Sequence, residues 1–235
     1  MKTGRLYLIP VPLGSQNPAA VLPASIYSAV NEIDYYVVEN EKTARRFIKQ
    51  IQPEKNQSSL HIELLNKHTG AIDVPRLLEP CKAGMNVGVM SEAGVPGVAD
   101  PGAAIVRIAH QMRIQVAPLV GPSSILLAMM ASGMNGQSFA FNGYLPMDAR
   151  ERKKSIKSYE SRARNLEQAQ IFIETPYRNN KLLNELIGTL SPDTLLCVAT
   201  DLTLDTEYIK CTTTALWKNE FIDLHKRPTI FIIGS

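Results

Sequence analysis

The sequence predicts an α/β protein whose strands pair mainly in parallel in the first half. Short apolar runs typical of buried strands alternate with segments in which apolar residues recur at helical spacing. Hydrophobic residues make up 45% and charged residues 20% of the 235 positions, as in an ordinary globular protein. This length suffices for one large or two small domains, and we place the join near residues 118–121, giving domains over 1–119 and 120–235.

The elements of the first half follow from local pattern. Strands are predicted where short apolar runs occur: 6–11, 35–38, 87–90 and 116–120, with one more inside the polar stretch 53–66. Helices are predicted where apolar residues recur every three or four positions: 22–33, 41–51, 74–81 and 103–112.

The second half begins with a helix over 125–131 that is apolar on nearly every side, which predicts a buried helix. A strongly charged helix is predicted over 148–166 and a further one over 176–190. The strands predicted around these helices are 138–143, 171–173, 195–200, 207–212 and 229–233.

Composition excludes several classes of protein. No apolar run approaches the ~20 residues that span a bilayer, and the N-terminus lacks a signal-peptide core, so we expect a cytoplasmic protein. Cys81, Cys197 and Cys211 are scattered and suggest neither a disulfide framework nor a zinc site. We interpret the histidines as surface or packing residues; they are His61, His68, His110 and His225. The net charge of +3 permits a polyanionic partner without requiring one.

The stretch 91–102 is the most informative motif. It reads Ser-Glu-Ala-Gly-Val-Pro-Gly-Val-Ala-Asp-Pro-Gly and lies between a predicted strand and a predicted helix. Small and rigid residues at a strand's carboxyl end let a ligand approach the backbone, although an ordinary strand-to-helix turn is supported about as well. Asp100 and Pro101 favour a helix start. A ligand held here would be neutral or zwitterionic, and we interpret Glu92 as a solvated carboxylate.

Two other turns follow predicted strands. Residues 10–14 (Pro-Val-Pro-Leu-Gly) lack the glycines of a dinucleotide-binding loop, which weakens NAD, FAD and ATP as ligands and favours an ordinary rigid turn. Residues 121–124 (Gly-Pro-Ser-Ser) open the apolar helix, where the hydroxyls either cap free amides or contact a ligand.

Two segments of the second half carry charge beside predicted strand ends. Residues 139–146 precede a helix whose basic residues share one face, namely Arg150, Lys153, Lys154 and Lys157, diluted by Glu151 and Glu160. Such a face is either solvated surface or a contact for a phosphate backbone. Glu174 and Arg178 follow the strand 171–173, where they form either a structural ion pair or part of a site.

Together these motifs resemble those of the tetrapyrrole methylase superfamily, and within it the branch of small-subunit rRNA (cytidine-2'-O)-methyltransferases. That branch carries A-T-P-I-G-N, S-D-A-G-x-P-x-I-S-D-P-G and P-G-P-S-A after successive strands, where this chain has residues 10–15, 91–102 and 120–124. It also carries F-x-F-x-G-F-L-P before a basic helix, and E-x-P-x-R, matched here by 139–146 and 174–178. The motifs run in the same order across most of the chain.

The resemblance implies a two-domain α/β fold with a mainly parallel N-terminal sheet and a mixed C-terminal sheet, usually in a homodimer. It implies S-adenosylmethionine bound in the cleft between the domains, held largely by backbone groups. Carried over by motif, the expected cofactor contacts are Pro12, Ser91, Ala93, Gly94, Asp100, Ser123 and Leu145. Expected RNA contacts are Arg150, Lys153 and Lys154, and candidate catalytic residues are Glu174, Arg178 and Glu207. No metal is implied.

The chain departs from the branch at two motifs. Its D-T-R after the second strand is replaced by residues 39–43 (Glu-Asn-Glu-Lys-Thr). Its late R-E-L-T-K is replaced by Thr-Asp-Leu-Thr-Leu, which puts Thr200 and Leu204 where arginine and lysine are usual. Three functions therefore stay open: methylation of a ribose 2'-hydroxyl in small-subunit rRNA, methylation of a tetrapyrrole or other small molecule, and non-catalytic binding of S-adenosylmethionine.

Overall fold

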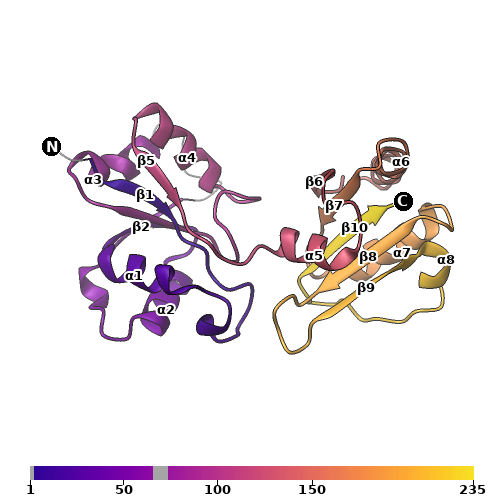
Figure 1. Ribbon diagram of the computed structural model, residues 1–235, viewed down its shortest axis with the longest axis horizontal. Coiled ribbons are helices and arrows are strands. Elements are labelled where there is room, and N and C mark those ends of the chain that lie inside the picture. Colours follow the sequence, from indigo (N-terminus) through magenta and orange to yellow (C-terminus); the bar gives the residue numbers. More distant parts are fainter. Residues whose placement is uncertain (1–2, 66–73) are drawn as a thin grey trace. The chain divides into compact units, whose positions relative to one another are not determined.

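The computed structural model describes residues 3–65 and 74–235, which divide into two compact units, Met1–Ser123 and Ser124–Ser235 (Figure 1). Each unit contains one five-stranded sheet with helices packed on it. The predicted packing role of His68 lies outside the described residues.

The first unit is built on an entirely parallel sheet with strand order β3-β2-β4-β1-β5. Its strands are β1 (Arg5–Leu8), β2 (Tyr35–Val38), β3 (His61–Leu64), β4 (Val87–Met90) and β5 (Gln115–Pro118). The central strand β4 is buried at every position, as expected of a strand covered on both faces. The mainly parallel N-terminal sheet predicted from the sequence is confirmed.

Helices cover both faces of this sheet (Figure 1). They are α1 (Ala24–Glu32), α2 (Glu41–Ile51), α3 (Glu79–Lys82) and α4 (Gly102–Gln111), with short 3-10 turns at Pro18–Ala20, Gln57–Ser59 and Val74–Leu78. Ile26 of α1 and Ile48 of α2 pack in one apolar core. Leu78 and Ile105 belong to a second core with α3 and α4. This two-sided covering leaves the strand ends as the place where loops form a ligand site.

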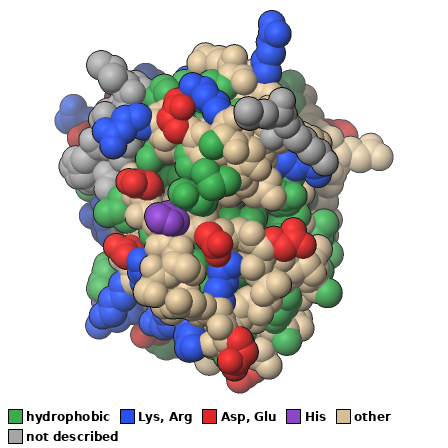
Figure 2. Space-filling model, turned by 90° about the vertical axis from the view of Figure 1, so that its left-hand side faces the viewer, with side chains coloured by type: hydrophobic (Ala, Val, Ile, Leu, Met, Phe, Trp, Pro, Cys, Tyr) green, Lys and Arg blue, Asp and Glu red, His purple; other side chains and the backbone are tan. Residues whose placement is uncertain are grey.

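Figure 2 shows the end of the first unit that lies at the left of Figure 1. On the part of this face that the structure describes, acidic and basic side chains are interspersed around small apolar areas. The face therefore carries charges of both signs and resembles an ordinary solvated surface.

The second unit has a mixed sheet with strand order β6-β7-β10-β8-β9, as predicted. Its strands are β6 (Phe139–Tyr144), β7 (Ala169–Ile173), β8 (Leu195–Thr200), β9 (Tyr208–Thr213) and β10 (Thr229–Gly234). β6 and β7 are parallel, whereas β10 pairs antiparallel with both β7 and β8, and β8 with β9. Its helices are α5 (Ser124–Ser132), α6 (Ala149–Asn165), α7 (Asn179–Thr189) and α8 (Thr214–Trp217).

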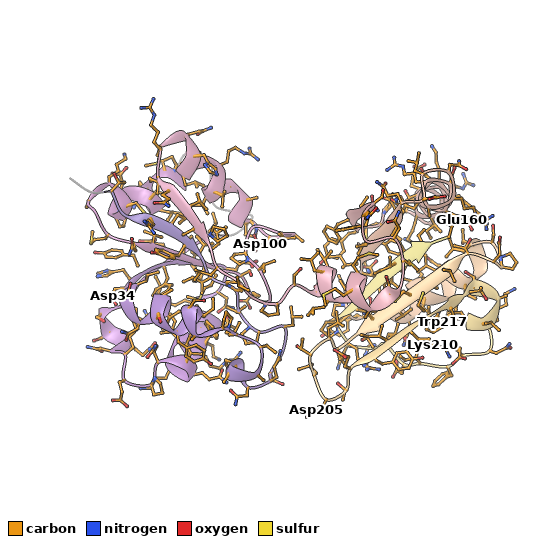
Figure 3. All side chains as sticks on the ribbon, viewed as in Figure 1. Asp34, Asp100, Glu160, Asp205, Lys210 and Trp217 are labelled. Carbon is orange, nitrogen blue, oxygen red and sulfur yellow. The ribbon has the colours of Figure 1, made fainter. Side chains whose placement is uncertain are left out.

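The core of the second unit lies between the sheet and helices α6, α7 and α8. Phe172, Leu186 and Phe231 are fully buried there. Trp217 of α8, labelled in Figure 3, donates from Nε1 to the carbonyl of Leu196 at 2.7 Å and is 1% exposed. Helix α5 packs on β9 and β10.

The structure corrects two details of the second half. Helix α5 is apolar all round, but within its unit it buries one side through Ala128 and Met129, while Leu126 and Met130 are 52% and 79% exposed. The prediction that α5 is buried throughout is therefore wrong. Helix α7 begins at Asn179 rather than at position 176, because residues 176–178 form a turn in which the Arg178 amide donates to the Thr175 carbonyl.

Candidate functional site

Three loops of the first unit meet at the carboxyl ends of its strands. Val11, after β1, exchanges two main-chain hydrogen bonds with Gly94, after β4, at 2.9 and 3.1 Å. The loop after β5 joins them: a Cβ on Gly121 would lie 2.2 Å from Cβ of Pro10, and one on Gly94 would lie 3.3 Å from the Pro122 carbonyl oxygen. The three Gly- and Pro-rich motifs of the sequence therefore form one cluster, because β1 lies between β4 and β5 in the sheet.

The loop after β4 has an unusual backbone. Gly94, Gly97 and Ala99 have positive φ values of 72°, 86° and 62°. The left-handed conformation costs a non-glycine residue about 1–2 kcal/mol, so the loop holds Ala99 in a conformation that such a residue disfavours. Strain of this kind is retained where surrounding structure imposes it and is frequent at ligand-binding sites.

Asp100 fixes the end of this loop. One carboxylate oxygen, Oδ1, accepts from the amides of Gly97 at 2.8 Å and Gly102 at 2.7 Å, so the carboxylate binds the first amide of α4 as predicted. Burial raises the pKa of Asp100, and the hydrogen bonds from these amides partly oppose the rise. Oδ2 is buried without a hydrogen bond of normal geometry, although the Ser91 hydroxyl is close enough to favour the charged form.

Two further carboxylates lie beside Asp100 at the same sheet edge. Glu92 is exposed, as predicted; its Oε1 accepts from the Thr43 hydroxyl at 2.5 Å, and its amide donates to Glu39 at 3.2 Å. Burial is the main cause that raises the pKa of Glu39, and the charges of Asp100 and Glu92 add to it. Figure 3 places Asp100 at the end of the sheet opposite Asp34. Among the described residues, no group of His, Cys, Asp and Glu side chains could hold a metal ion.

Two cavities flank the loop cluster within the first unit. The larger, about 420 Å³, is lined about equally by polar and apolar atoms. We call it the polar cavity because, besides Pro12 and Ser91, its lining includes Asn40, Thr43, Arg46, Gln50 and Glu92. The other, about 410 Å³, is largely apolar and is lined by Leu8, Pro10, Val95, Pro96, Gly97, Val98, Ala103, Val106, Pro118 and Leu119. Both volumes fall in the range of small-molecule sites.

Residues of α2 in the polar cavity were not predicted as site residues. They reach the cluster because β2 neighbours β4 in the sheet, so that the helix after β2 begins beside the loop after β4. The side chain of Asn40 caps α2 by accepting from the amides of Lys42 and Thr43. Arg46 is exposed on the same helix. The sequence signal for these residues was the helix start that follows the second strand.

The predicted cofactor contacts are distributed over both units. Pro12, Ser91, Ala93, Gly94 and Asp100 lie in the loop cluster of the first unit, and Ser123 ends that unit at the start of α5. Leu145 belongs to the second unit, where it follows β6 and packs into the core at 3% exposure. Almost none of the surface of Leu145 is therefore open within its own unit.

Glu174 and Arg178 form an ion pair at the carboxyl end of β7. Oε1 of Glu174 accepts from Arg178 Nη2 at 2.5 Å and from the Thr175 amide at 2.6 Å, and its side chain is 6% exposed. The structural ion pair, one of the two alternatives left open by the sequence, is therefore present, and a role in a site stays a prediction. The third catalytic candidate, Glu207, is exposed and accepts from the Thr203 amide at 2.7 Å.

The basic side chains of α6 differ in their surroundings. Arg150, Lys153 and Lys154 are exposed. Lys157 instead pairs with Glu160 at 2.7 Å. Glu160 was expected to dilute the basic surface, but it is 5% exposed and also accepts from the Thr194 hydroxyl and the Ser191 amide, so it belongs to the interior. It still offsets the charge of Lys157, as expected, which leaves Arg150, Lys153 and Lys154 as the exposed basic side chains without that partner.

Comparison with known proteins gives sequence relatives over most of the chain, although no family model matches it. The chain is 27% identical over 241 residues to "Ribosomal RNA small subunit methyltransferase I" of Buchnera aphidicola subsp. Schizaphis graminum, covering 99% of this chain and 78% of that protein. It is 26% identical to the Escherichia coli O157:H7 protein of that name, covering 88% and 68%, and 28% identical to the Bacillus subtilis one, covering 92% and 71%.

Solved structures share the fold. A crystal structure of the methyltransferase CobJ superposes with a TM-score of 0.65 at 18% identity, covering 99% of this chain and 95% of that one. A uroporphyrin-III-C-methyltransferase from Thermus thermophilus gives 0.56 at 14% identity, covering 98% and 92%.

Fold and relatives agree: the chain is a methyltransferase that has the fold of the solved CobJ and uroporphyrin-III-C-methyltransferase structures. In sequence it is similar to proteins named for small-subunit ribosomal RNA.

Proposed function

We propose that this methyltransferase uses S-adenosylmethionine to methylate a ribose 2'-hydroxyl in small-subunit rRNA. The observation that carries the proposal is the cluster of three loops between an apolar and a polar cavity, in a chain similar over most of its length to rRNA methyltransferases. One cavity suits a donor and the other a polar acceptor.

The residues of the loop cluster fit the proposed donor. Gly97 has open space where a side chain would lie, whereas Gly94 and Gly121 let the three loops pack closely against one another. S-adenosylmethionine carries a sulfonium and an ammonium group, and Glu39, Glu92 and Asp100 place negative charge at this edge of the sheet. The predicted contacts Pro12, Ser91, Ala93, Gly94, Asp100, Ser123 and Leu145 remain our proposal, and the structure leads us to add Val95 and Val98.

The polar cavity is the proposed entrance of the acceptor. When bound, the donor supplies a methyl group already activated on sulfur. The protein must therefore align the acceptor hydroxyl and remove its proton. Arg46 offers a cation for a phosphate group, while Asn40 and Thr43 offer polar side chains around the hydroxyl.

Glu92 is the carboxylate that we propose as proton acceptor. It lines the polar cavity, is exposed, and is oriented by the Thr43 hydroxyl. Glu174, Arg178 and Glu207 stay candidates, but each already has a structural partner: the first two bind each other and Glu207 holds the Thr203 amide. A general base within reach of its proton contributes about 10²–10⁴-fold to a rate.

Thr200 and Leu204, which stand where the rRNA methyltransferase branch usually has arginine and lysine, are compatible with this proposal. The main chain of Leu204 shapes its loop, because its amide donates to the Asp201 carbonyl and its carbonyl accepts from Glu207, both at 2.9 Å. Arg227 reaches the same loop and pairs with Asp201 at 2.7 Å. The loop thus keeps a defined structure and a neighbouring cation without the usual lysine.

The test is incubation of the purified protein with methyl-labelled S-adenosylmethionine and small ribosomal subunits from a strain that lacks this gene. Label mapped to a ribose supports the proposal. Label that enters a tetrapyrrole precursor instead, accompanied by a Soret shift, would identify a small-molecule methyltransferase. Cofactor binding without turnover on either acceptor would identify a non-catalytic S-adenosylmethionine-binding protein.

We also propose a cytoplasmic homodimer, for which the resemblance is the support. Among the described residues, no helix has the length and apolar character needed to cross a membrane. Sedimentation of the purified protein measures the oligomeric state directly; a monomer at micromolar concentration would end that part of the proposal.

A further inference from the structure

Two cysteines that are distant in sequence lie opposite each other in the second sheet. Cys197 of β8 and Cys211 of β9 are partners in the antiparallel register, and both are free thiols. The spacing of the cysteines in the sequence did not predict this pair, because the connection between the two strands, residues 201–207, is long. Both cysteines lie outside the loop cluster and its cavities.

The hydrogen bonds around the pair identify its type. The Thr214 amide donates to the Thr194 carbonyl at 2.9 Å, so the bonds between β8 and β9 fall at alternate positions counted from Thr194. Cys197, three positions after Thr194, does not belong to that alternating series, so its main-chain N–H and C=O groups point toward β10. The hydrogen bond from the Asp201 amide to the Pro228 carbonyl agrees with this, because it places Cys197 in the hydrogen-bonded series between β8 and β10. Cys197 and Cys211 are therefore a non-hydrogen-bonded pair.

This pair type sets a short distance between the two cysteines. Opposite residues in non-hydrogen-bonded positions have Cα atoms about 4.5 Å apart, which lies inside the range of about 4.4–6.8 Å that disulfides span. Both side chains also project from the same face of the sheet. A disulfide between them requires rotation of side chains and little movement of backbone.

The surroundings distinguish the two thiols. Cys197 is fully buried and Cys211 half-buried. A hydrogen bond between them lowers the pKa of Cys211 and raises that of Cys197, with burial adding to the rise. Because the thiolate is the reactive form of cysteine, Cys211 is the member that meets an oxidant first.

We propose that Cys197 and Cys211 form a dithiol site that hydroperoxides oxidise to a cross-strand disulfide. The Cys211 thiolate attacks the peroxide, the O–O bond breaks, and a sulfenic acid forms with release of hydroxide or alkoxide, which takes a proton from water. The Cys197 sulfur then attacks the sulfenic sulfur, the S–O bond breaks, and water leaves with the thiol proton. Overall, two thiols are oxidised and one peroxide is reduced.

The disulfide would close the base of the β8–β9 connection. This connection carries Asp201 and Glu207, and Asp205 lies at its tip in Figure 3. Helix α5 packs on β9. Oxidation would therefore tie together the two strands that flank the late motif, whether or not the acceptor is RNA.

The experiment treats the reduced full-length protein with hydrogen peroxide, blocks remaining thiols with iodoacetamide in denaturant, and maps non-reduced peptides by mass spectrometry. We expect one linked peptide joining Cys197 and Cys211, lighter by two hydrogens, with Cys81 alkylated, and recovery of both thiols after dithiothreitol. Recovery of Cys211 as sulfinic acid with Cys197 alkylated would overturn the proposal, as would a disulfide that involves Cys81.

Two variants serve as controls. Cys81→Ser removes the buried cysteine of the first unit and should leave the linked peptide unchanged. Cys211→Ser should leave Cys197 alkylatable after peroxide treatment. If either variant fails to fold, the wild-type peptide map still decides the outcome, because it locates each sulfur individually.

Discussion

Arg152 of α6 and Glu185 of α7 are joined by two hydrogen bonds, at 2.5 and 2.8 Å, in a largely buried ion pair. Arg152 is 8% exposed, and its remaining nitrogen donates to the carbonyls of Pro146 and Met147 at 3.0 and 2.7 Å. One guanidinium group thus connects two helices to the segment that follows β6. That segment includes Leu145, a proposed donor contact.

Replacing Arg152 by leucine should destabilise the protein by about 3 kcal/mol, because it leaves Glu185 without its partner and two carbonyls without donors. The matched control is Arg150→Leu on the same helix, where the side chain is exposed and the expected change is within about 0.5 kcal/mol. Urea denaturation of both variants measures the difference. Equal midpoints would show that the ion pair contributes nothing net.

Glu160 should make the stability of the protein depend on pH in the acid range. Burial alone would raise its pKa, but hydrogen bonds from Lys157, Thr194 and Ser191 lower it from 4.5 to about 2. A lowered folded pKa means that the stabilisation is complete above pH 4.5 and disappears as pH falls toward 2. By linkage the loss is at most about 3 kcal/mol.

Comparison of wild type with Glu160→Gln isolates this contribution. The free energy of unfolding of the two proteins, measured by denaturant at a series of pH values, should differ most at neutral pH and converge in acid. A difference that stays constant with pH would mean that the carboxylate does not titrate as described.

Gly94→Ala tests the loop cluster. Gly94 has a φ of +72°, and a Cβ there would lie 3.1 Å from Cδ2 of Leu13, so alanine should cost about 1–2 kcal/mol and weaken S-adenosylmethionine binding. Gly188→Ala is the control: this helical glycine has open space around it, and alanine should stabilise by up to about 1 kcal/mol. Calorimetric titration with the cofactor should separate the two variants; equal affinity would place the donor elsewhere.

Glu92→Gln tests the proposed proton acceptor. Glutamine can still accept the Thr43 hydroxyl but cannot take a proton, so we expect kcat to fall at least about tenfold while cofactor affinity stays within about twofold. Single-turnover methylation of small ribosomal subunits measures the step. A rate like that of wild type, with normal donor binding, would leave Glu174 and Glu207 as the remaining carboxylates to test.

Charge reversal at Arg150 and Lys153 tests the basic face of α6. If this face contacts RNA phosphates, the double variant should bind rRNA more weakly, and its affinity should fall less steeply with salt concentration. Charge reversal at Lys181 and Lys218, two other exposed lysines of the second unit, is the control for net charge. An unchanged salt dependence would remove α6 from the RNA contact surface.

Local pattern predicted the elements of this chain well because each depends on neighbouring residues. The strand 35–38, the helix 41–51 and the strand 195–200 have the predicted bounds. Helix α5 shows the limit of such reasoning. An apolar helix can pack against a sheet through one side only, and its sequence does not show which side is buried and which is exposed.

Site residues were predictable where a motif coincides with a strand end, as at Ser91 and Gly94. They were not predictable where the order of strands in the sheet determines which residues meet. Arg46 and Thr43 line a cavity with Glu92 because β2 lies beside β4. The Cys197–Cys211 pair depends likewise on register between strands. The roles of the cofactor, RNA and catalytic candidates stay predictions for the experiments above.

The strand order of both sheets also bears on how the chain folds during synthesis. β1 pairs only with β4 and β5, which are made after most of the unit, and β10 is inserted between β7 and β8, which precede it. Neither sheet can be completed until its last strand has left the ribosome. Non-local pairing of this kind slows folding and leaves strand edges exposed to aggregation in the meantime. A ribosome that pauses before residue 229 would hold a half-built second sheet lacking its central strand.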